Sequence, residues 1–553
     1  MFRTHFPDGT GLKRGAVCLV VVLLPSCGSS DPPSDGTAGA TTGGSAGSVA
    51  SSGAGGSTSA GGSAGGNSGG SVTAGASGAA VSGSGGAPAG GGGSAGATVG
   101  GSSAGNPSAG AGSGDTFVSG VNVAVHPEVS TILVVTWNQT TAAESTWLEF
   151  TFEAGNVMKS RPKPGTAGMH RDVVLGAPAQ TPVTIRIVSL QGGVEHETRD
   201  YQGTTEALPA RLPRPEVLAY DAARASPERW MLAAVEDSEG GCGRPCYNQW
   251  TYWTYIMDRK GRIVWYYADP ASNATSSYQR VALDGEYIWI EKRPFGGSGS
   301  RGVLKMTLDW EYFEEVPVPN LADCIDITDD GSLLYDVTGT TDLREMRRDR
   351  TVRNIWNCRT AFGQSFSCYS NTVNWNKATN TILMSFPEEN TVAEIHRETG
   401  MLVATYGDRA GSYAFSPSTW QFEFQHFPNI SADGTLMVSS HMPGFADTYR
   451  PVAGEHAFLE FTIDRANRRL VEKWSYHEGP EWPMFKGMAI RLPNGNTLAN
   501  YGSGGVIREI TPDKQTVFHV KFDAPMGDDF YNKMVGHNVY IDDLYALNGG
   551  GPR

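Results

Sequence analysis

The sequence has few cysteines, no long hydrophobic run and no excess of positive charge, and each shortage restricts what the protein can be. Its 553 residues contain 43 Lys and Arg against 57 Asp and Glu, so the formal net charge is −14. Nucleic-acid binding needs clustered Lys and Arg against the phosphates, and docking on an anionic membrane surface needs the same sign of charge. The composition therefore argues against both kinds of partner and favours solubility.

The only strongly apolar stretch near the N-terminus is short. It covers residues 17–24, follows several basic residues, and ends at Leu24-Pro25-Ser26-Cys27. A run of this length cannot span a bilayer as a helix and is typical of a cleaved export signal. Its end resembles a bacterial lipobox, which predicts a lipoprotein signal over 1–27, acylation of Cys27, and a cell-envelope protein anchored to a membrane outside the cytoplasm. The alternative is a plain secretory signal in which Cys27 has no role.

Five of the seven cysteines follow the predicted signal. An odd number in an oxidising compartment leaves at least one thiol outside the intrachain disulfides. Cys242 with Cys246 and Cys358 with Cys368 are the natural local disulfides, which leaves Cys324 as a thiol. The alternative for the first pair is two loop cysteines that do not join. No second Cys/His pair lies at zinc-ligand spacing, and the sequence indicates no metal or other cofactor.

Residues 28–115 consist almost entirely of Gly, Ser, Ala and Thr, and much of the total of 71 glycines lies there. Such a segment buries no apolar surface and cannot offset the entropy lost on ordering. We expect a disordered tether that holds the folded part away from the membrane.

The composition changes at residue 116, where short runs with strong β propensity begin. Residues 131–137, 146–152 and 182–190 alternate partly or cleanly between apolar and polar side chains and are bounded by turn residues. This spacing predicts a small β-sandwich over 116–213, similar to a fibronectin type III module, that ends at a Pro-rich linker.

A strand–turn–strand pattern then recurs at blade-sized intervals over 214–553. Residues 325–334, 373–384, 429–438 and 489–499 each contain an apolar run, a polar turn with Gly or Asn, and a second apolar run. Asp-Gly and Asn-Gly turns between apolar runs indicate hairpins. Repeats of this size predict a β-propeller, and we count six blades. The predicted fold class is therefore all-β, with a disordered tether, a fibronectin III-like sandwich and a six-bladed propeller.

Several blade openings carry a more specific pattern. Residues 485–498 (FKGMAIRLPNGNTL) and 506–513 (VIREITPD) resemble a strand–turn–strand of the arylsulfotransferase family. Residues 424–429 (FQHFPN) and 371–376 (NTVNWN) are similar to two other blade openings of that family. The resemblance covers most of 217–547.

The resemblance implies transfer of a sulfuryl group from an aryl sulfate to a phenolic acceptor, without a nucleotide donor. By motif, the nucleophile is His426, which forms a transient sulfohistidine. A neutral imidazole is a good nucleophile near neutral pH, and covalent catalysis divides a difficult displacement into two steps. Cations or hydrogen-bond donors must converge on the sulfuryl oxygens.

The chain departs from the family at three supporting positions. Tyr369 and Cys324 stand where the family has histidine, and Pro387 stands where it has arginine. Candidate substitutes are His441, Lys486 and Tyr369, which lie near expected strand ends. The alternative function is a propeller that kept the scaffold and lost the chemistry, acting as a tethered ligand- or protein-binding module.

Each candidate also has a structural interpretation. A histidine at a strand start is often purely structural, His441 is also consistent with a solvated loop, and Lys486 with simple exposure. Cys324 is consistent with a small buried hydrophobe. The acidic residues between Asp323 and Asp330 do not match a calcium-binding loop and are better explained by turn formation.

Overall fold

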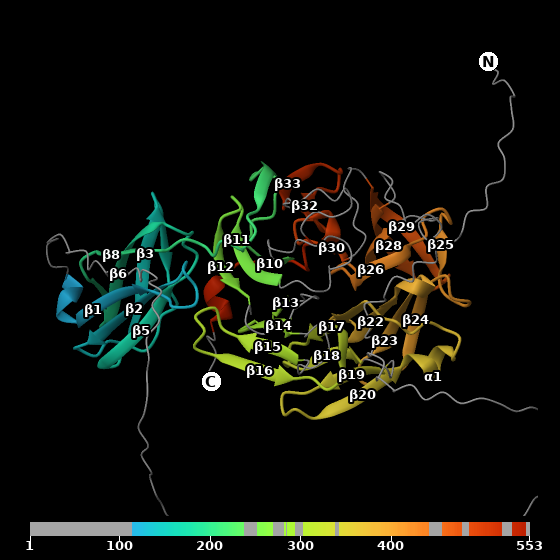
Figure 1. Ribbon diagram of the computed structural model, residues 1–553, viewed down its shortest axis with the longest axis horizontal. Helices are drawn as coiled ribbons and strands as arrows, with labels where there is room; N and C mark the ends of the chain where they lie inside the picture. Colours follow the sequence, from blue (N-terminus) through green and yellow to red (C-terminus); the bar gives the residue numbers. More distant parts are fainter. Residues whose placement is uncertain are drawn as a thin grey trace, which may run out of the picture. The chain divides into compact units, whose positions relative to one another are not determined.

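The structure of the chain is a computed structural model, and every statement below concerns the residues that it describes. These are 113–236, 252–268, 281–283, 285–292, 302–337, 342–441, 456–477, 486–522 and 534–548. The predicted signal and residues 28–112 of the predicted tether lie outside them, as do Cys27, Cys242 and Cys246. The last residues of that predicted tether belong to the 3-10 helix η1 (Ser113–Thr116). The described part is all-β, with a β-sandwich followed by a six-bladed β-propeller, which confirms the predicted fold class (Figure 1). No helix in these ranges is long and apolar enough to cross a membrane.

The sandwich consists of two antiparallel sheets arranged as in a fibronectin III module. Strand β2 alternates strictly between buried and half-buried side chains, and its buried residues Leu133, Val135 and Trp137 enter the core. One sheet has the order β1 (Val118–Val125), β2 (Leu133–Gln139), β5 (Gly168–Val174). The other has the order β4 (Asn156–Lys159), β3 (Ser145–Glu153), β6 (Pro182–Gln191), β7 (Val194–Glu197), with β8 (Tyr201–Thr204) also paired to β6.

Blades 1 to 3 of the propeller are four-stranded antiparallel sheets. Blade 1 contains β34 (Val539–Ile541), β10 (Trp230–Glu236), β11 (Tyr252–Asp258) and β12 (Ile263–Tyr267). Blade 2 contains β13 (Val281–Leu283), β14 (Ile288–Lys292), β15 (Gly302–Met306) and β16 (Phe313–Pro317). Blade 3 contains β17 (Leu321–Ile327), β18 (Leu333–Val337), β19 (Asp342–Met346) and β20 (Val352–Asn357).

Blades 4 to 6 follow the same order from the inner to the outer strand. Blade 4 contains β21 (Thr372–Asn376), β22 (Thr381–Phe386), β23 (Thr391–His396) and β24 (Leu402–Gly407). Blade 5 contains β26 (Glu423–Ile430), β27 (Thr435–His441), β28 (His456–Asp464), β29 (Arg469–Tyr476) and β25 (Ala414–Ser416), the last paired in parallel. Blade 6 contains β30 (Gly487–Arg491), β31 (Thr497–Tyr501), β32 (Val506–Ile510), β33 (Thr516–Lys521) and β9 (Glu216–Tyr220).

Both ends of the propeller sequence take part in closing the ring. Strand β34, near the C-terminus, pairs with β10 and becomes the inner strand of blade 1, while β9 pairs with β33 at the outer edge of blade 6. Strand β34 is followed by the short 3-10 helix η5 (Leu544–Leu547), so it supplies a single strand to blade 1.

Buried carboxylates connect each of the last four blades to the next one. The third strands of blades 3 to 6 carry glutamates that are at most 1% exposed, and each forms an ion pair with an arginine of the following blade. The pairs are Glu345–Arg397 (2.5 Å), Glu394–Arg465 (3.1 Å), Glu460–Arg491 and Glu509–Arg259 (2.5 Å). Arg259 belongs to blade 1, so the last pair connects the two ends of the ring.

Blade 2 differs from this pattern. Lys305 occupies the place of the buried glutamate on the third strand, and its ammonium group lies over the rings of Tyr287 (4.1 Å) and Trp289 (4.9 Å). A cation is attracted by the faces of aromatic rings. At this position blade 2 therefore has a cation packed on rings where blades 3 to 6 have a carboxylate.

The sandwich and the propeller share hydrogen bonds. The hydroxyl of Tyr545, in η5, donates to the carbonyl of Val173 (2.8 Å) and accepts from the amide of Leu175 (3.2 Å). The hydroxyl of Tyr266, in blade 1, accepts from the amide of Ser130 (2.8 Å). These bonds tie the sandwich to blade 1 and to the segment that follows β34.

The acidic residues before β18 form a turn, as predicted. Asp330 Oδ1 accepts hydrogen bonds from the Thr328 hydroxyl and the Ser332 amide (3.0 Å), and Gly331 has a φ of +73°. A φ in this range favours glycine because a Cβ atom is unfavourable there. Asp433 and Gly434 repeat the arrangement in blade 5.

The cysteine predictions are confirmed where the structure describes them. Cys358, at the start of the short helix α1 (Cys358–Phe362), forms a disulfide with Cys368 ten residues later. Cys324 is 3% exposed, is not disulfide-bonded, and packs in the same hydrophobic cluster as that disulfide.

Removing the carboxylate of Glu509 tests the inter-blade pairs. In Glu509→Ala the buried guanidinium of Arg259 loses its ion pair. We therefore expect the free energy of unfolding to decrease by about 3 kcal/mol or more. Urea unfolding followed by tryptophan fluorescence measures the change. The control Glu398→Ala removes an exposed partner of Arg353 and should change stability by about 0.5 kcal/mol or less. Equal effects of the two variants would contradict the assignment.

Because of the same pairs, the free energy of unfolding depends on pH. Burial by itself raises the pKa of Glu345, Glu460 and Glu509, but hydrogen bonds and nearby cations outweigh it and lower each pKa below the ordinary value of 4.5. Groups with a lowered folded-state pKa stabilise fully above 4.5, and this contribution disappears as the pH falls through the folded-state pKa. We expect the urea midpoint to be constant near neutral pH and to decrease below about pH 4.5. A midpoint that rises on acidification would refute this.

Candidate functional site

Strand β26 lines the centre of the propeller and is distorted on both sides of His426. Its pairing with β27 shifts between Glu423 and His426 and again between His426 and Asn429. Phe424 and Phe427 have positive φ angles of 45° and 52°, which are unfavourable for aromatic residues. Bulges commonly redirect a side chain, and strained residues persist only where their surroundings hold them. His426 is therefore placed by its neighbours rather than by the regular sheet.

Gln425 supplies much of that support. It is fully buried, and its side-chain nitrogen donates to Ser385 Oγ (3.1 Å) and to the carbonyls of Phe386 (3.3 Å) and Thr391 (3.1 Å) in blade 4. The backbone carbonyl of Gln425 accepts a hydrogen bond from the side-chain nitrogen of Asn371 (2.9 Å). Of the two adjacent residues in the FQHFPN motif, Gln425 therefore has a structural role, and His426 beside it is half-buried.

The hydrogen bonding of His426 defines its tautomer. Nδ1 lies 3.0 Å from the carbonyl oxygen of Phe424. A carbonyl only accepts hydrogen bonds, so Nδ1 carries the proton and Nε2 carries a lone pair. Burial lowers the pKa of His426 to about 4, the Phe424 carbonyl opposes this, and the charge of Lys486 lowers it further. At neutral pH the ring is uncharged.

Three more polar side chains lie on the same face of blade 5 as His426. Ser439 stands directly opposite His426 in the ladder, and His441 stands opposite His456. Cross-strand partners point to the same face. Ser439 Oγ lies 3.2 Å from His456 Nε2, and the rings of His441 and His456 are 5.7 Å apart. Burial, together with His441 and His426, lowers the pKa of His456 well below its ordinary value.

This face packs closely against the start of blade 6. A Cβ atom on Gly487 would lie 1.9 Å from Ser439 Oγ, so only glycine fits there without movement. Lys486 precedes it, is 9% exposed, and places its ammonium group 4.4 Å from the centre of the Tyr252 ring and 3.4 Å from the Tyr252 hydroxyl. Lys486 is therefore a buried cation, and its charge acts on His426.

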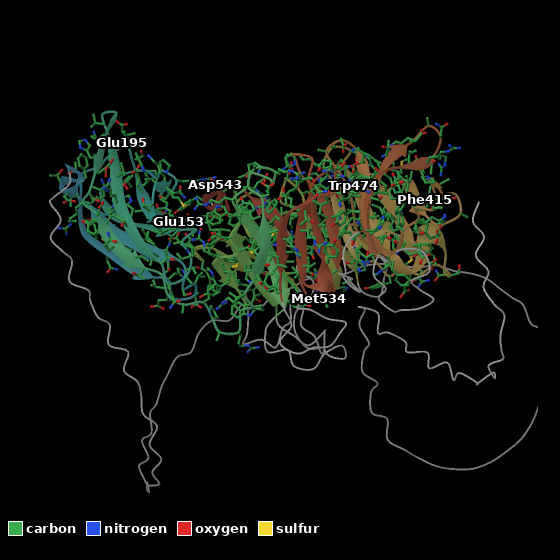
Figure 2. All side chains as sticks on the ribbon, turned by 90° about the horizontal axis from the view of Figure 1, so that it is seen from above. Glu153, Glu195, Phe415, Trp474, Met534 and Asp543 are labelled. Atoms are coloured by element: carbon green, nitrogen blue, oxygen red, sulfur yellow. A yellow bond between two sulfur atoms is a disulfide. The ribbon has the colours of Figure 1, made fainter. Side chains whose placement is uncertain are left out.

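Two structural interpretations of the predicted candidates were wrong. His441 is the last residue of β27 and is 2% exposed, so it is no solvated loop residue, and Lys486 is buried rather than exposed. The Tyr252 hydroxyl, which Lys486 contacts, donates to Met534 Sδ (3.2 Å). Figure 2 labels Met534 at one face of the ring.

The three positions at which the sequence departs from the family lie in blades 3 and 4. Tyr369 is half-buried and lies in the chain between the disulfide and β21. Asn371, two residues later, donates a hydrogen bond to the backbone of Gln425, so this segment borders the end of the pore at which His426 lies. Pro387 is buried in the 3-10 helix η3 (Pro387–Glu389). Cys324 packs in the core of blades 3 and 4.

The residues that carry the most specific resemblance are structural. Arg491 pairs with the buried Glu460 of blade 5, and Asn496 donates to Glu509 in its own blade (2.7 Å). Both therefore hold the glutamates that join the blades. Within the described residues no group of three or more His, Cys, Asp and Glu is arranged to hold a metal ion.

Sequence reasoning missed Ser439, His456 and Tyr252. The first two become visible only through strand register, because His456 is adjacent to His441 across the sheet and not along the chain. Tyr252 comes from blade 1, more than two hundred residues before Lys486. The resulting arrangement offers an uncharged imidazole whose Nε2 carries a lone pair, together with a buried cation whose charge acts on it. Both features suit nucleophilic attack on an anionic group.

The tautomer and pKa of His426 can be measured directly. In ¹⁵N-histidine-labelled protein we expect an Nδ1-protonated ring that titrates near pH 4, because burial and Lys486 disfavour the imidazolium. Lys486→Met removes the nearby charge and should move that pKa upward, toward 6.5. Lys377→Met, at an exposed ion pair with Asp329, is the matched control and should leave it unchanged. A titration near 6.5 in the unmodified chain would contradict this description.

No protein-family model matches the chain, and no curated protein is significantly similar to it. Solved structures show weak similarity. Virginiamycin B lyase from Staphylococcus aureus is 10% identical over 55% of this chain and 88% of its own, with a TM-score of 0.33. A 6-phosphogluconolactonase-like protein from Bacteroides fragilis is 16% identical over 70% and 98%, with a TM-score of 0.32. Hsv2 from Kluyveromyces lactis is 9% identical over 66% and 95%, with a TM-score of 0.29. Similarity at this level carries no inference about the chemistry of the chain.

Proposed function

We propose that the chain is an exported arylsulfotransferase-like enzyme that transfers a sulfuryl group from an aryl sulfate to a phenol through His426. The observation that carries the proposal is the state of that ring. Its Nδ1 proton is held by the Phe424 carbonyl, its Nε2 keeps a lone pair, and its low pKa keeps it uncharged at neutral pH. The export and acylation of Cys27 predicted from residues 1–27 belong to the same proposal.

The reaction divides into two balanced displacements. In the first, Nε2 of His426 attacks the sulfur of the aryl sulfate, and an N–S bond forms. The bond between sulfur and the oxygen of the aryl group breaks, and the donor leaves as a phenolate. In the second, the oxygen of the acceptor phenol attacks the same sulfur, the N–S bond breaks, and the acceptor proton passes to solvent. His426 returns to its initial state, and the sulfuryl group has changed partners.

The surroundings of His426 assist both steps. The Phe424 carbonyl accepts from Nδ1 and stabilises the positive charge that the ring acquires when Nε2 becomes bonded to sulfur. The charge of Lys486 lowers the pKa of His426, and we assign to its ammonium group the stabilisation of the sulfuryl oxygens. Gln425 and the two bulges fix the direction of the ring, which reduces the reorganisation needed for attack.

Aryl sulfate turnover tests the proposal. The full chain is incubated with 4-nitrophenyl sulfate and a phenol acceptor, and nitrophenol release is followed. We expect release that His426→Ala abolishes, and that Lys486→Met reduces by about 100-fold, because one group that stabilises developing charge typically contributes this much. His396→Ala, in blade 4 with its ring bonded to Thr399, is the matched control and should retain activity.

Absence of release by folded protein would refute the enzyme and favour the second candidate, a binding module that kept the scaffold. The specific observation behind that candidate is Pro387. It is buried in η3 at the position where the resemblance places an arginine, so blade 4 contributes no cation from that position.

A further inference from the structure

The outer edges of five blades are covered or charged. An edge strand presents unpaired N–H and C=O groups, and proteins protect such an edge with a covering segment, a charge or a proline. In blade 1 the outer strand β12 is buried, and its Val264 carbonyl accepts from the Thr131 hydroxyl of the sandwich (2.7 Å). Blades 5 and 6 are covered by the additional strands β25 and β9. The outer strands of blades 2 and 3 carry Glu314, Glu315 and Arg353.

Strand β24, the outer strand of blade 4, lacks these forms of protection over most of its length (Figure 1). Its sequence LVATYG contains no charged residue and no proline. Met401, Leu402 and Val403 are 66%, 39% and 44% exposed, so three successive apolar side chains face solvent. The chain covers its far end, where the Tyr413 amide donates to the Thr405 carbonyl (3.0 Å). Along 401–404, no strand of the described part pairs with the outer edge.

A bulge in the pairing of β24 with β23 does not prevent a further strand from adding to this edge. The outer strands of blades 5 and 6, β29 and β33, have the same kind of register shift against their inner neighbours. Both nevertheless pair with another strand, β25 in one blade and β9 in the other. The fold thus shows twice that the outer strand of a blade accepts an additional strand.

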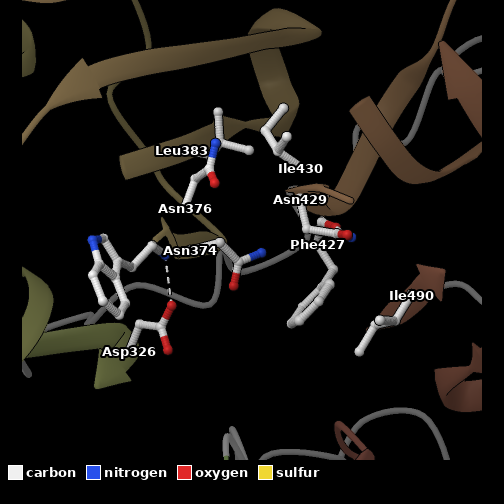
Figure 3. A pocket seen from close by; sticks show the side chains of 9 residues that line it. Asp326, Asn374, Asn376, Leu383, Phe427, Asn429, Ile430 and Ile490 are labelled. Carbon is white, nitrogen blue, oxygen red and sulfur yellow. Dashed lines mark hydrogen bonds between the residues drawn. The ribbon is translucent and has the colours of Figure 1, made fainter. Parts of the chain in front are cut away.

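The opposite edge of blade 4 is closed to a partner molecule. Its inner strand β21 faces the centre of the propeller, where residues of β21, β26 and β30 line a cavity of about 210 Å³ (Figure 3). This volume corresponds to roughly seven water molecules at about 30 Å³ each, which is too little for a strand. A second molecule therefore reaches blade 4 from outside, at β24.

We infer that β24 pairs with β24 of a second copy of this chain, antiparallel and about a two-fold axis. The matching partner is itself an open edge without charge, and among the described outer strands of the propeller β24 has both properties. A two-fold axis is the commonest symmetry of homodimers and places the same strand on both sides of the contact. Each chain has a net charge of −14, so two copies repel each other in general, and an uncharged edge avoids adding to that repulsion.

Charges beside the edge favour the antiparallel direction. Glu398, in the turn before β24, has a side chain that is 53% exposed. At the other end Arg468 donates to the carbonyl of Gly411, and its guanidinium lies 5.1 Å from the centre of the Tyr413 ring. Antiparallel pairing brings the turn of one copy to the segment 411–413 of the other, so Glu398 approaches Arg468 of the second copy. Parallel pairing would place like charges side by side.

Sedimentation velocity of the full chain tests the inference. Four paired residues on each side form a contact smaller than the roughly 1,600 Å² of a stable interface, so we expect a reversible dimer with a Kd on the order of 10 µM. Val403→Lys adds a charge to the edge and should weaken association at least about ten-fold. Val157→Lys, at a more exposed valine of β4 in the sandwich, is the matched control and should leave the Kd unchanged. The urea midpoint of each variant verifies folding.

Cysteine cross-linking tests which residues meet. Residues opposite each other in an antiparallel pair have Cα atoms about 4.5–5.5 Å apart, a distance that a disulfide spans. Because the two-fold axis passes through 401–404, Leu402→Cys or Val403→Cys should form a covalent dimer on oxidation, and Val157→Cys should not.

A chain that stays monomeric would overturn the inference and leave this edge to an extended segment of another protein. Association that is unchanged in folded Val403→Lys, or cross-linking no greater at 402 and 403 than at 157, would also overturn it. The inference does not depend on the proposed function. His426→Ala, which abolishes the proposed turnover, should associate like the unmodified chain.

Discussion

The interaction on which the structure depends most is the pairing of a buried glutamate with an arginine of the following blade. A buried carboxylate without a cation is strongly unfavourable. Glu345 and Glu460 pair with a cation of their own blade, Arg353 and Lys473, as well as with an arginine of the next one. Glu394 and Glu509 take their arginine from the next blade, and for Glu509 this is Arg259 at the beginning of the ring. A linear row of sheets would leave the last carboxylate unpaired. The charges therefore favour a closed ring over an open array.

At the central pore, hydrogen bonds from side-chain amides also join neighbouring blades. Asn374, Gln425 and Asn429 use their side-chain amides to bond the backbone of the adjacent blade. Gln425 and Asn429 stand on either side of His426, so they hold the distorted strand at both ends of its most strained part. The residues that align the blades thus also align the candidate nucleophile. This explains why β26 tolerates two aromatic residues at positive φ.

The hairpins, the six blades and the sandwich were predictable because their signals are local, such as a polar turn between two apolar runs. The disulfide between Cys358 and Cys368 was predictable for the same reason. Strands β9 and β34 were not, since each is a short single strand without a turn, defined only by its distant partner. His456 and Tyr252 were missed because register and ring closure bring them to the site. The buried glutamates look like exposed residues of alternating strands, and only their arginines show otherwise.

The position of β34 also constrains the order of folding. Blade 1 contains β10 to β12, yet its innermost strand, Val539–Ile541, is synthesised only after the described strands of blades 2 to 6. Blades 2 to 5 can form from neighbouring segments as the chain is synthesised, whereas blade 1 cannot be completed until β34 has been made. Contacts between residues so distant in sequence form slowly. The ring is therefore closed only after β34 has been synthesised, whatever order the other blades form in.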